Sequence, residues 1–159
     1  MQTDKILLIA RETINKVSYC FAITTADNGE ANARIVQPRT LQDDWTVDFM
    51  TSRRCRKVKE MELSGKLTLA YQHDPDRGYV CLIGRASIVD DIQLKRSTWS
   101  PEADRWFPGG PDDPNVVIVR LATDRIELWN SVRDVMPEPK GLSAAVLVRE
   151  GSGWRYWAT

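Results

Sequence analysis

The spacing of hydrophobic residues changes early in the chain, from a helical period to a strand period. Between Ile6 and Val17 apolar residues recur every three or four positions, which predicts an amphipathic helix. Residues 19–25 are rich in β-formers and lead into Asn28-Gly29, a dipeptide typical of tight hairpin turns. The sequence therefore predicts one N-terminal helix followed by a β-hairpin.

Further strands are expected where β-branched and aromatic residues lie between turn signals. They cover residues 31–36, 45–51, 67–72, 79–89, 116–121 and 126–129, with a terminal hairpin at 145–149 and 154–157. A short, strongly basic helix is expected from Arg53 to Leu63, with Val58, Met61 and Leu63 facing inward and Gly65 ending it. Residues 90–106 are expected to be partly helical.

These elements predict a mainly β protein with flanking helices (α+β), built on an antiparallel β-barrel that carries helices on its ends. Gly84, inside a predicted strand, predicts a β-bulge or a close backbone approach. Neither a repeat nor a domain linker interrupts residues 1–159, so we expect a single domain of ordinary size, with a C-terminal extension from about residue 131.

Composition narrows the classes of function. The chain has 22 basic and 22 acidic residues, and this balance argues against a general nucleic-acid binder. Three scattered cysteines and one histidine argue against a metal site and favour a reducing compartment. The N-terminal apolar run is too short for a signal peptide or a membrane span. We therefore expect a cytoplasmic protein without a metal or a membrane partner.

The most informative chemistry lies where the strand at 45–51 ends. Thr51 and Ser52 are followed at once by Arg53, Arg54, Arg56 and Lys57 at the start of the predicted basic helix. Helix starts attract anions, and hydroxyl and cationic groups are common partners of a phosphate monoester. A solvated basic helix face would give the same local pattern. Arg34, on the preceding strand, favours the phosphate site because it is expected to approach the same spot as Thr51.

Several of these segments resemble the pyridoxamine 5′-phosphate oxidase-like FMN-binding split barrel superfamily. The resemblance is carried by Arg34-Ile35-Val36, Met50-Thr51 and Cys55-Arg56-Lys57, and by residues 67–71 and 79–86. It covers roughly residues 5–130. Residues 99–114 and 127–130 are similar to the general stress protein branch of that superfamily. The resemblance implies a split β-barrel that binds FMN.

The same resemblance implies roles for individual residues in binding FMN. Arg34, Arg56 and Lys57 would hold the FMN phosphate with help from Thr51. The backbone of Ile35, Val36, Gln37 and Arg39 would run along the isoalloxazine and the ribityl chain, and Met50 would contact the flavin or its ribityl chain.

The resemblance also implies roles for two further residues, one of them at a subunit interface. Tyr79 occupies the position of a flavin-contacting glutamine in the oxidases. Trp129 would pack near the cofactor of the partner subunit, because members of the superfamily build each flavin site at a homodimer interface. The resemblance thus implies a homodimer with flavin sites between its subunits.

Two departures from the superfamily's motifs shape the functional hypotheses. Cys55 replaces a serine, and its basic neighbours predict a lowered thiol pKa, whereas Cys20 and Cys81 are expected in the buried core. The C-terminal Arg-x-His motif of the true oxidases is absent, so pyridoxamine phosphate oxidation is not expected. An FMN-dependent oxidoreductase with an unidentified substrate is the leading hypothesis, beside a non-catalytic FMN-binding or sensing module and an F420-binding relative. Haem is disfavoured because His73, the single histidine, lies in a predicted loop.

Overall fold

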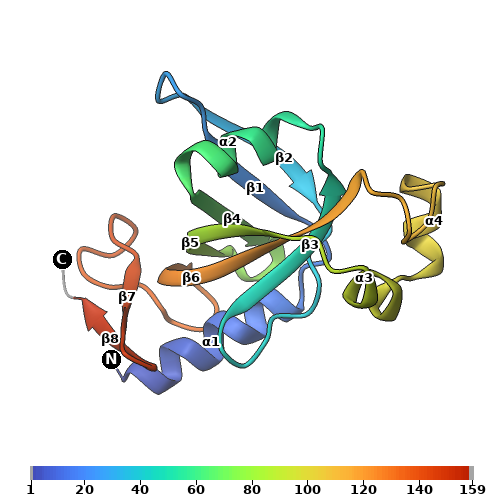
Figure 1. Cartoon of the computed structure of the whole chain (residues 1–159). Coiled ribbons are helices and arrows are strands. Elements are labelled where there is room, and N and C mark those ends of the chain that lie inside the picture. Colours follow the sequence, from blue (N-terminus) through green and yellow to red (C-terminus); the bar gives the residue numbers. More distant parts are fainter. Residues whose placement is uncertain (1, 158–159) are drawn as a thin grey trace.

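The computed structural model describes residues 2–157 and consists of one large antiparallel sheet with helices on its periphery (Figure 1). The helices are α1 (Thr3–Asn15), α2 (Arg56–Ser64), the 3₁₀ turn η1 (Asp74–Asp76), α3 (Ile92–Thr98) and α4 (Pro101–Trp106). The strands are β1 (Cys20–Thr25), β2 (Ala31–Val36), β3 (Thr46–Ser52), β4 (Lys66–His73), β5 (Gly78–Val89), β6 (Val116–Asn130), β7 (Ala145–Glu150) and β8 (Gly153–Trp157).

The sheet follows the order β2-β1-β4-β5-β6-β7-β8, and β3 pairs with the first half of β6. Among the described residues 2–157, β2 pairs only with β1 and β3 pairs only with β6, so the sheet curls without closing. The expected antiparallel, mainly β architecture with flanking helices is confirmed as an open split barrel. Residues beyond 131 first form a connector and then the β7–β8 hairpin, which extends the sheet from β6.

The core lies between the concave face of the sheet and α1. Apolar residues at the helical spacing of α1 are buried, among them Ile6, Ile9 and Ile14, as the sequence predicts. On the strands, alternate residues such as Leu69 and Leu82 are fully buried. This alternation gives most strands an inner face toward the core and an outer face away from it, whereas residues 116–119 at the start of β6 are all buried.

One predicted pair of strands is wrong, because residues 116–121 and 126–129 belong to a single strand, β6. The polar residues between them do not form a turn. Thr123 is buried and its hydroxyl donates to the Trp45 carbonyl at 2.7 Å. At Gly84 the register of β5 against β6 shifts, and a Cβ there would lie 2.0 Å from the Ala122 carbonyl oxygen. The bulge predicted at Gly84 is confirmed, and it lets β5 stay paired with β6 over its whole length.

The predicted start of the basic helix is also wrong. Arg53 and Arg54 lie in a turn, and the helix begins at Arg56 after Cys55, which is extended. The Arg53 amide donates to the Asn115 carbonyl at 2.7 Å, which ties the turn to the segment entering β6. Leu63, expected inside, is 79% exposed, whereas Val58 and Met61 are buried and Gly65 ends the helix at φ 71°.

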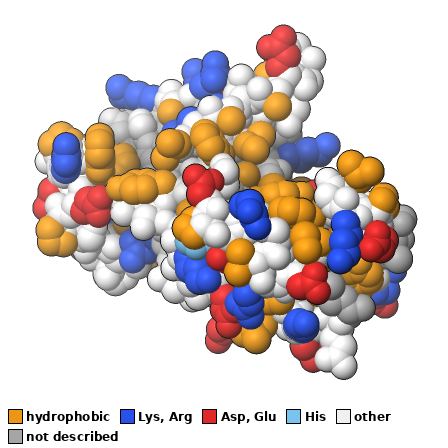
Figure 2. Space-filling view, turned by 180° about the vertical axis from the view of Figure 1, so that it is seen from behind, with side chains coloured by type: hydrophobic (Ala, Val, Ile, Leu, Met, Phe, Trp, Pro, Cys, Tyr) orange, Lys and Arg blue, Asp and Glu red, His pale blue; other side chains and the backbone are white. Residues whose placement is uncertain are grey.

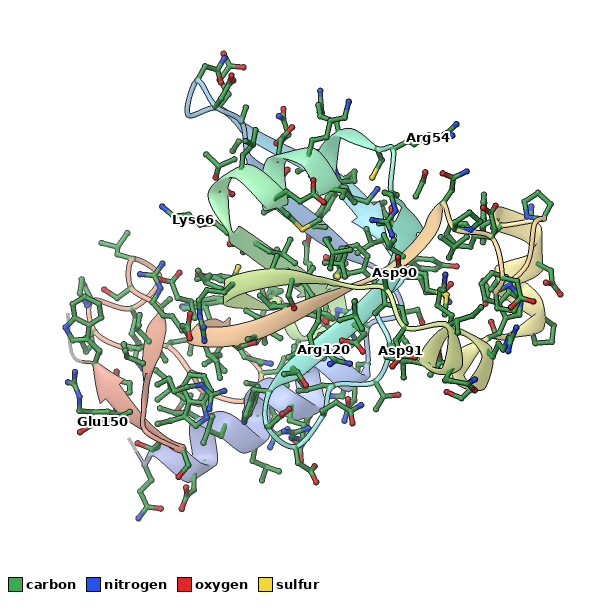
Figure 3. The ribbon with its side chains drawn as sticks, viewed as in Figure 1. Arg54, Lys66, Asp90, Asp91, Arg120 and Glu150 are labelled. Carbon is green, nitrogen blue, oxygen red and sulfur yellow. The ribbon has the colours of Figure 1, made fainter. Side chains whose placement is uncertain are left out.

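Residues 90–114 leave the sheet between β5 and β6 and carry α3 and α4 (Figure 1). Their base is fixed by Lys95, whose buried ammonium donates to the Val116 carbonyl at 3.0 Å. Asp90 lies 3.6 Å from the same ammonium and also pairs with Arg53 (Figure 3). None of the helices within residues 2–157 is long and apolar enough to cross a membrane.

Candidate functional site

The basic run after β3 divides between two surroundings. Arg53 turns toward Asp90 and the Pro114 carbonyl, and so braces the base of the α3–α4 segment. Arg54 is exposed and points away from the body of the protein (Figure 3). Arg56 and Lys57 open α2, with Arg56 directed along the helix toward Glu60. Only the second half of the run therefore remains available to the predicted phosphate site.

Arg34 reaches the same region from the inner face of β2. Its guanidinium donates to the Thr24 hydroxyl at 2.6 Å and to the Ala22 carbonyl at 3.3 Å. Burial lowers the pKa of Arg34, Glu60 opposes this, and the positive charge of Arg56 lowers it further. The charges of Glu60 and Arg56 therefore both act on the Arg34 guanidinium.

Thr51 and Cys55 join the strand end to the helix start. The Thr51 hydroxyl lies 3.5 Å from the Cys55 sulfur, and Thr51 is buried while Cys55 is half-buried. Burial acts to raise the pKa of Cys55, but hydrogen bonds from Thr51 and the Val58 amide, together with Lys57, lower it overall. The expected depression of this thiol pKa is confirmed. We call Arg34, Thr51, Cys55, Arg56 and Lys57 the cationic cluster.

Pairing of their strands does not bring Arg34 and Thr51 to the same region. Within residues 2–157, β2 pairs only with β1 and β3 only with β6. Instead α2 packs over β1 and carries Cys55 into the neighbourhood of Arg34, whose pKa responds to that thiol. Helix packing rather than strand pairing therefore assembles the cluster.

Glu60 is the member of this region that the sequence analysis missed. Glu60 is 6% exposed, and its Oε2 accepts from the Thr24 hydroxyl at 2.8 Å while its Oε1 accepts from the Asn32 amide at 3.0 Å. The Arg56 Nε lies 3.2 Å from the same Oε1. The sequence did contain a clue to this contact, because Arg56 and Glu60 are four residues apart in a predicted helix and such residues are neighbours on the helix surface.

The segment after β2 does not run on into the cationic cluster. Ile35 is 63% exposed on the outer face, whereas Val36 is buried. The Gln37 amide donates to Glu102 of α4 at 3.3 Å, and Arg39 donates to the Thr98 carbonyl of α3 at 2.7 Å. The predicted flavin-lining segment is thus bordered by the α3–α4 segment.

Met50 lies on the opposite side of β3 from Thr51, because successive strand residues alternate. The same side carries Asp48, whose carboxylate accepts two hydrogen bonds from Arg120 at 2.9 Å. A polar hollow of about 700 Å³ opens here, lined by Asp48, Arg120, Arg39 and Thr98 among others. Met50 and Thr51 therefore cannot both face the cationic cluster.

The second region lies on the outer face of the sheet, where Tyr79 and Trp129 are direct partners on β5 and β6. They line a cavity of about 710 Å³ together with Phe21, Tyr71 and Cys81. The Trp129 Nε1 is buried and has no hydrogen-bond partner within residues 2–157. We call this the outer-face cavity. Cys81, expected in the core, is half-exposed here because the register of β5 turns it outward.

The cationic cluster and the outer-face cavity lie on opposite faces of the same sheet. Arg34 is opposite Ala22 on the buried side, whereas the neighbouring Ile35 is opposite Phe21 on the outer side. Phe21 continues through Ala70 to Cys81, which shares its face with Tyr79. One chain therefore does not bring Arg34 and Trp129 together.

The residues present fit a flavin nucleotide in two parts. The cationic cluster offers charged donors and the start of a nine-residue helix, a combination suited to a terminal phosphate. The outer-face cavity offers aromatic walls and one buried, unpaired indole N–H, a combination suited to a ring that carries hydrogen-bond acceptors. Within residues 2–157, no group of three or more His, Cys, Asp or Glu side chains is arranged to hold a metal ion.

The fold defines the class of protein first: an open split barrel whose helices cover its ends. A family model described as pyridoxamine 5′-phosphate oxidase like matches residues 7–147, and the chain belongs to this family. General stress protein 26 of Bacillus subtilis is 29% identical over 113 residues, covering 69% of this chain and 79% of that protein. Protein bli-3 of Neurospora crassa is 26% identical over 81 residues, covering 46% and 39%.

Solved structures agree on the fold. A protein related to general stress protein 26 from Clostridium acetobutylicum superposes with a TM-score of 0.71 at 20% identity, covering 82% of this chain and 92% of that one. A pyridoxamine 5′-phosphate oxidase-related, FMN-binding protein from Nostoc punctiforme gives a TM-score of 0.74 at 17% identity, covering 99% and 95%. These similarities establish the split-barrel fold.

Proposed function

We propose that this protein binds FMN, with its phosphate at the cationic cluster of one subunit and its ring against the outer-face cavity of the partner. The single observation that carries the proposal is the convergence of Arg34, Arg56 and the start of α2 around one half-buried spot. Family membership and the FMN-binding protein among the structural neighbours support the same cofactor.

The proposal requires a homodimer, because the cationic cluster and the outer-face cavity of one subunit lie on opposite faces of its sheet. Large apolar side chains on the outer face are unusually exposed: Phe21 is 44%, Ile35 63% and Tyr79 37% exposed. Seen from behind, hydrophobic side chains gather in a band across the molecule (Figure 2). An exposed apolar patch of this kind is typical of a protein interface, and a twofold axis would present the cavity of each subunit to the other.

In this arrangement the chain's own residues bind and orient the cofactor. Arg34, Arg56 and Lys57 would neutralise the phosphate, and Thr51 would donate to it. Tyr79 and Trp129 would pack against the ring and exclude water from it. When bound, FMN supplies hydride and electron transfer that no side chain can perform. The proposed class is thus an FMN-dependent oxidoreductase connected with stress, with three free thiols suited to a reducing cytosol.

The direct test is a visible spectrum of the purified protein, before and after dithionite. We expect a yellow protein, or a colourless one that becomes yellow with added FMN, and bleaching on reduction. A protein that stays colourless and does not bind FMN at micromolar concentration would refute the proposal. A spectrum typical of a deazaflavin would identify the F420-binding alternative instead.

Binding alone does not establish turnover, because the cofactor carries the reactive atoms. Stopped-flow mixing of the FMN-loaded protein with NADH or NADPH separates an oxidoreductase from a sensing module. Rapid reduction supports the enzyme, whereas a flavin that only dithionite reduces supports a non-catalytic role.

A further inference from the structure

The buried carboxylate of Glu60 lies in an unexpected place, at the centre of a region that otherwise gathers positive charge. A buried charge is tolerated when it is paired and hydrogen-bonded. Glu60 meets both conditions: the Thr24 hydroxyl and the Asn32 amide donate to it, and Arg56 pairs with it at 3.2 Å. No part of the FMN proposal uses this residue.

Two of the predicted phosphate-binding cations depend on Glu60 for their positions. Arg56 contacts it directly. Arg34 is connected through Thr24, whose hydroxyl accepts from Arg34 at 2.6 Å while donating to Glu60 at 2.8 Å. A hydroxyl has a single hydrogen, so the bond to Glu60 leaves its lone pairs oriented toward Arg34. Glu60 is therefore linked to both guanidinium groups, from two different elements, while Arg34 is also held by the Ala22 and Asn32 carbonyls.

We infer that Glu60 is a positioning residue that preorganises Arg34 and Arg56 to receive a terminal phosphate, an inference that rests on the FMN site proposed above. Without it, Arg56 is a long side chain on an exposed helix start, and binding would have to order it at an entropic cost. A negative charge near a phosphate also repels it, so Glu60 would favour phosphate binding by fixing the geometry of the arginines and not by its charge.

The test compares the affinities of FMN and riboflavin, two ligands that differ only in the phosphate. In Glu60→Ala we expect FMN affinity to fall at least about tenfold while riboflavin affinity is unchanged, since only charge-assisted contacts are lost. Glu60→Gln should recover part of the loss, because its amide oxygen still accepts from Thr24 or Arg56. Thr24→Val removes the link to Arg34 and one donor to Glu60 but keeps the pair of Glu60 with Arg56, so its FMN affinity should lie between those of the wild type and Glu60→Ala.

Glu62→Ala is the matched control, since Glu62 lies on the same helix and is exposed. It should leave both affinities as in the wild type. Thermal unfolding of each variant, without ligand, separates positioning from general stability: a purely structural role would lower the melting temperature without changing the ratio of FMN to riboflavin affinity. An unchanged ratio in Glu60→Ala overturns the inference, while FMN binding by the wild type leaves the proposed function standing.

Inorganic phosphate provides a second probe that does not need a flavin. We expect phosphate to slow iodoacetamide alkylation of Cys55, which belongs to the cluster, in the wild type and in Glu62→Ala but not in Glu60→Ala. If the wild type fails to bind FMN but shows this Glu60-dependent protection, the flavin proposal falls and the inference stands. If the wild type binds neither FMN nor phosphate, both are overturned.

Discussion

The cationic cluster and the outer-face cavity lie on opposite faces of one sheet, and they follow different physical rules. In the cluster, charges are matched side by side, and Glu60 ties two arginines to one spot. In the cavity, aromatic walls leave a single indole N–H without a partner within residues 2–157. If the proposed dimer forms, the difference would mean that one sheet binds a phosphate on one face and a ring on the other, with a second subunit completing each site.

The largest effect is expected from a substitution that prevents the proposed dimer from forming. Ile35→Glu would bury an unpaired carboxylate twice across a twofold interface, so we expect dimer affinity to fall by on the order of a thousandfold. FMN binding should fall with it, although Arg34 and Arg56 are intact. Analytical ultracentrifugation and flavin fluorescence measure the two effects.

Leu63→Glu is the control for that experiment, because Leu63 is 79% exposed on α2 and not on the outer face of the sheet. It should remain dimeric. A monomeric wild type, or an Ile35→Glu variant that binds FMN normally, would mean that one subunit suffices and that the two regions are unrelated.

A smaller loss is expected when only the phosphate half is damaged. Arg34→Met removes a charged donor, a class of hydrogen bond that contributes about 1.5–3 kcal/mol, so FMN should bind roughly 10- to 150-fold more weakly. Riboflavin should bind as before, because it lacks the phosphate. Arg54→Met is the control, since Arg54 points away from the body of the protein (Figure 3). Equal losses for both ligands would contradict a phosphate-specific role.

The reactivity of two thiols, Cys55 in the cationic cluster and Cys81 in the outer-face cavity, should depend differently on pH. The pKa of Cys55 is lowered: burial opposes the change, but Thr51, the Val58 amide and Lys57 outweigh it, whereas burial and then Glu127 raise the pKa of Cys81 to about 11. The thiolate is the reactive form, so Cys55 should be alkylated at least about tenfold faster than Cys81 at pH 8. The ratio should shrink as the pH approaches 11, because Cys81 then ionises.

Mass spectrometry of peptides after timed alkylation measures both rates in one sample. Cys20, which is buried and whose pKa burial raises to about 12, serves as the internal reference for a folded chain. Similar rates for Cys55 and Cys81 at pH 8 would show that the cationic cluster does not activate its thiol.

The sequence predicted the cationic cluster better than the cavity, and the reason is the range of the interactions. Thr51, Cys55, Arg56 and Lys57 lie within seven consecutive positions, so a strand end and a helix start were enough to place them together. The division of the basic run was not predictable, because Arg53 is held by Asn115 and Asp90, which are distant in the chain.

The cavity depends instead on register. Tyr79 and Trp129 face each other only because the shift at Gly84 resets the pairing of β5 with β6. Alternation of polar and apolar residues identifies strands but does not fix which distant residues become neighbours. For the same reason Cys81, which was expected in the core, lies on the outer face.

The smallest expected effect concerns the unpaired indole. Trp129→Phe keeps an aromatic wall but removes Nε1, which is buried without a partner within residues 2–157. If this N–H donates to a flavin ring, a neutral hydrogen bond of about 0.5–1.5 kcal/mol is lost, so binding should weaken roughly two- to tenfold. Because the ring is common to FMN and riboflavin, both should lose equally, unlike the Arg34→Met case. Trp106→Phe, at a tryptophan that is 63% exposed on α4, is the control. If Trp129→Phe binds flavin normally and gains thermal stability, the N–H is an unsatisfied group that the fold tolerates, and the outer-face cavity is not the ring half of the site.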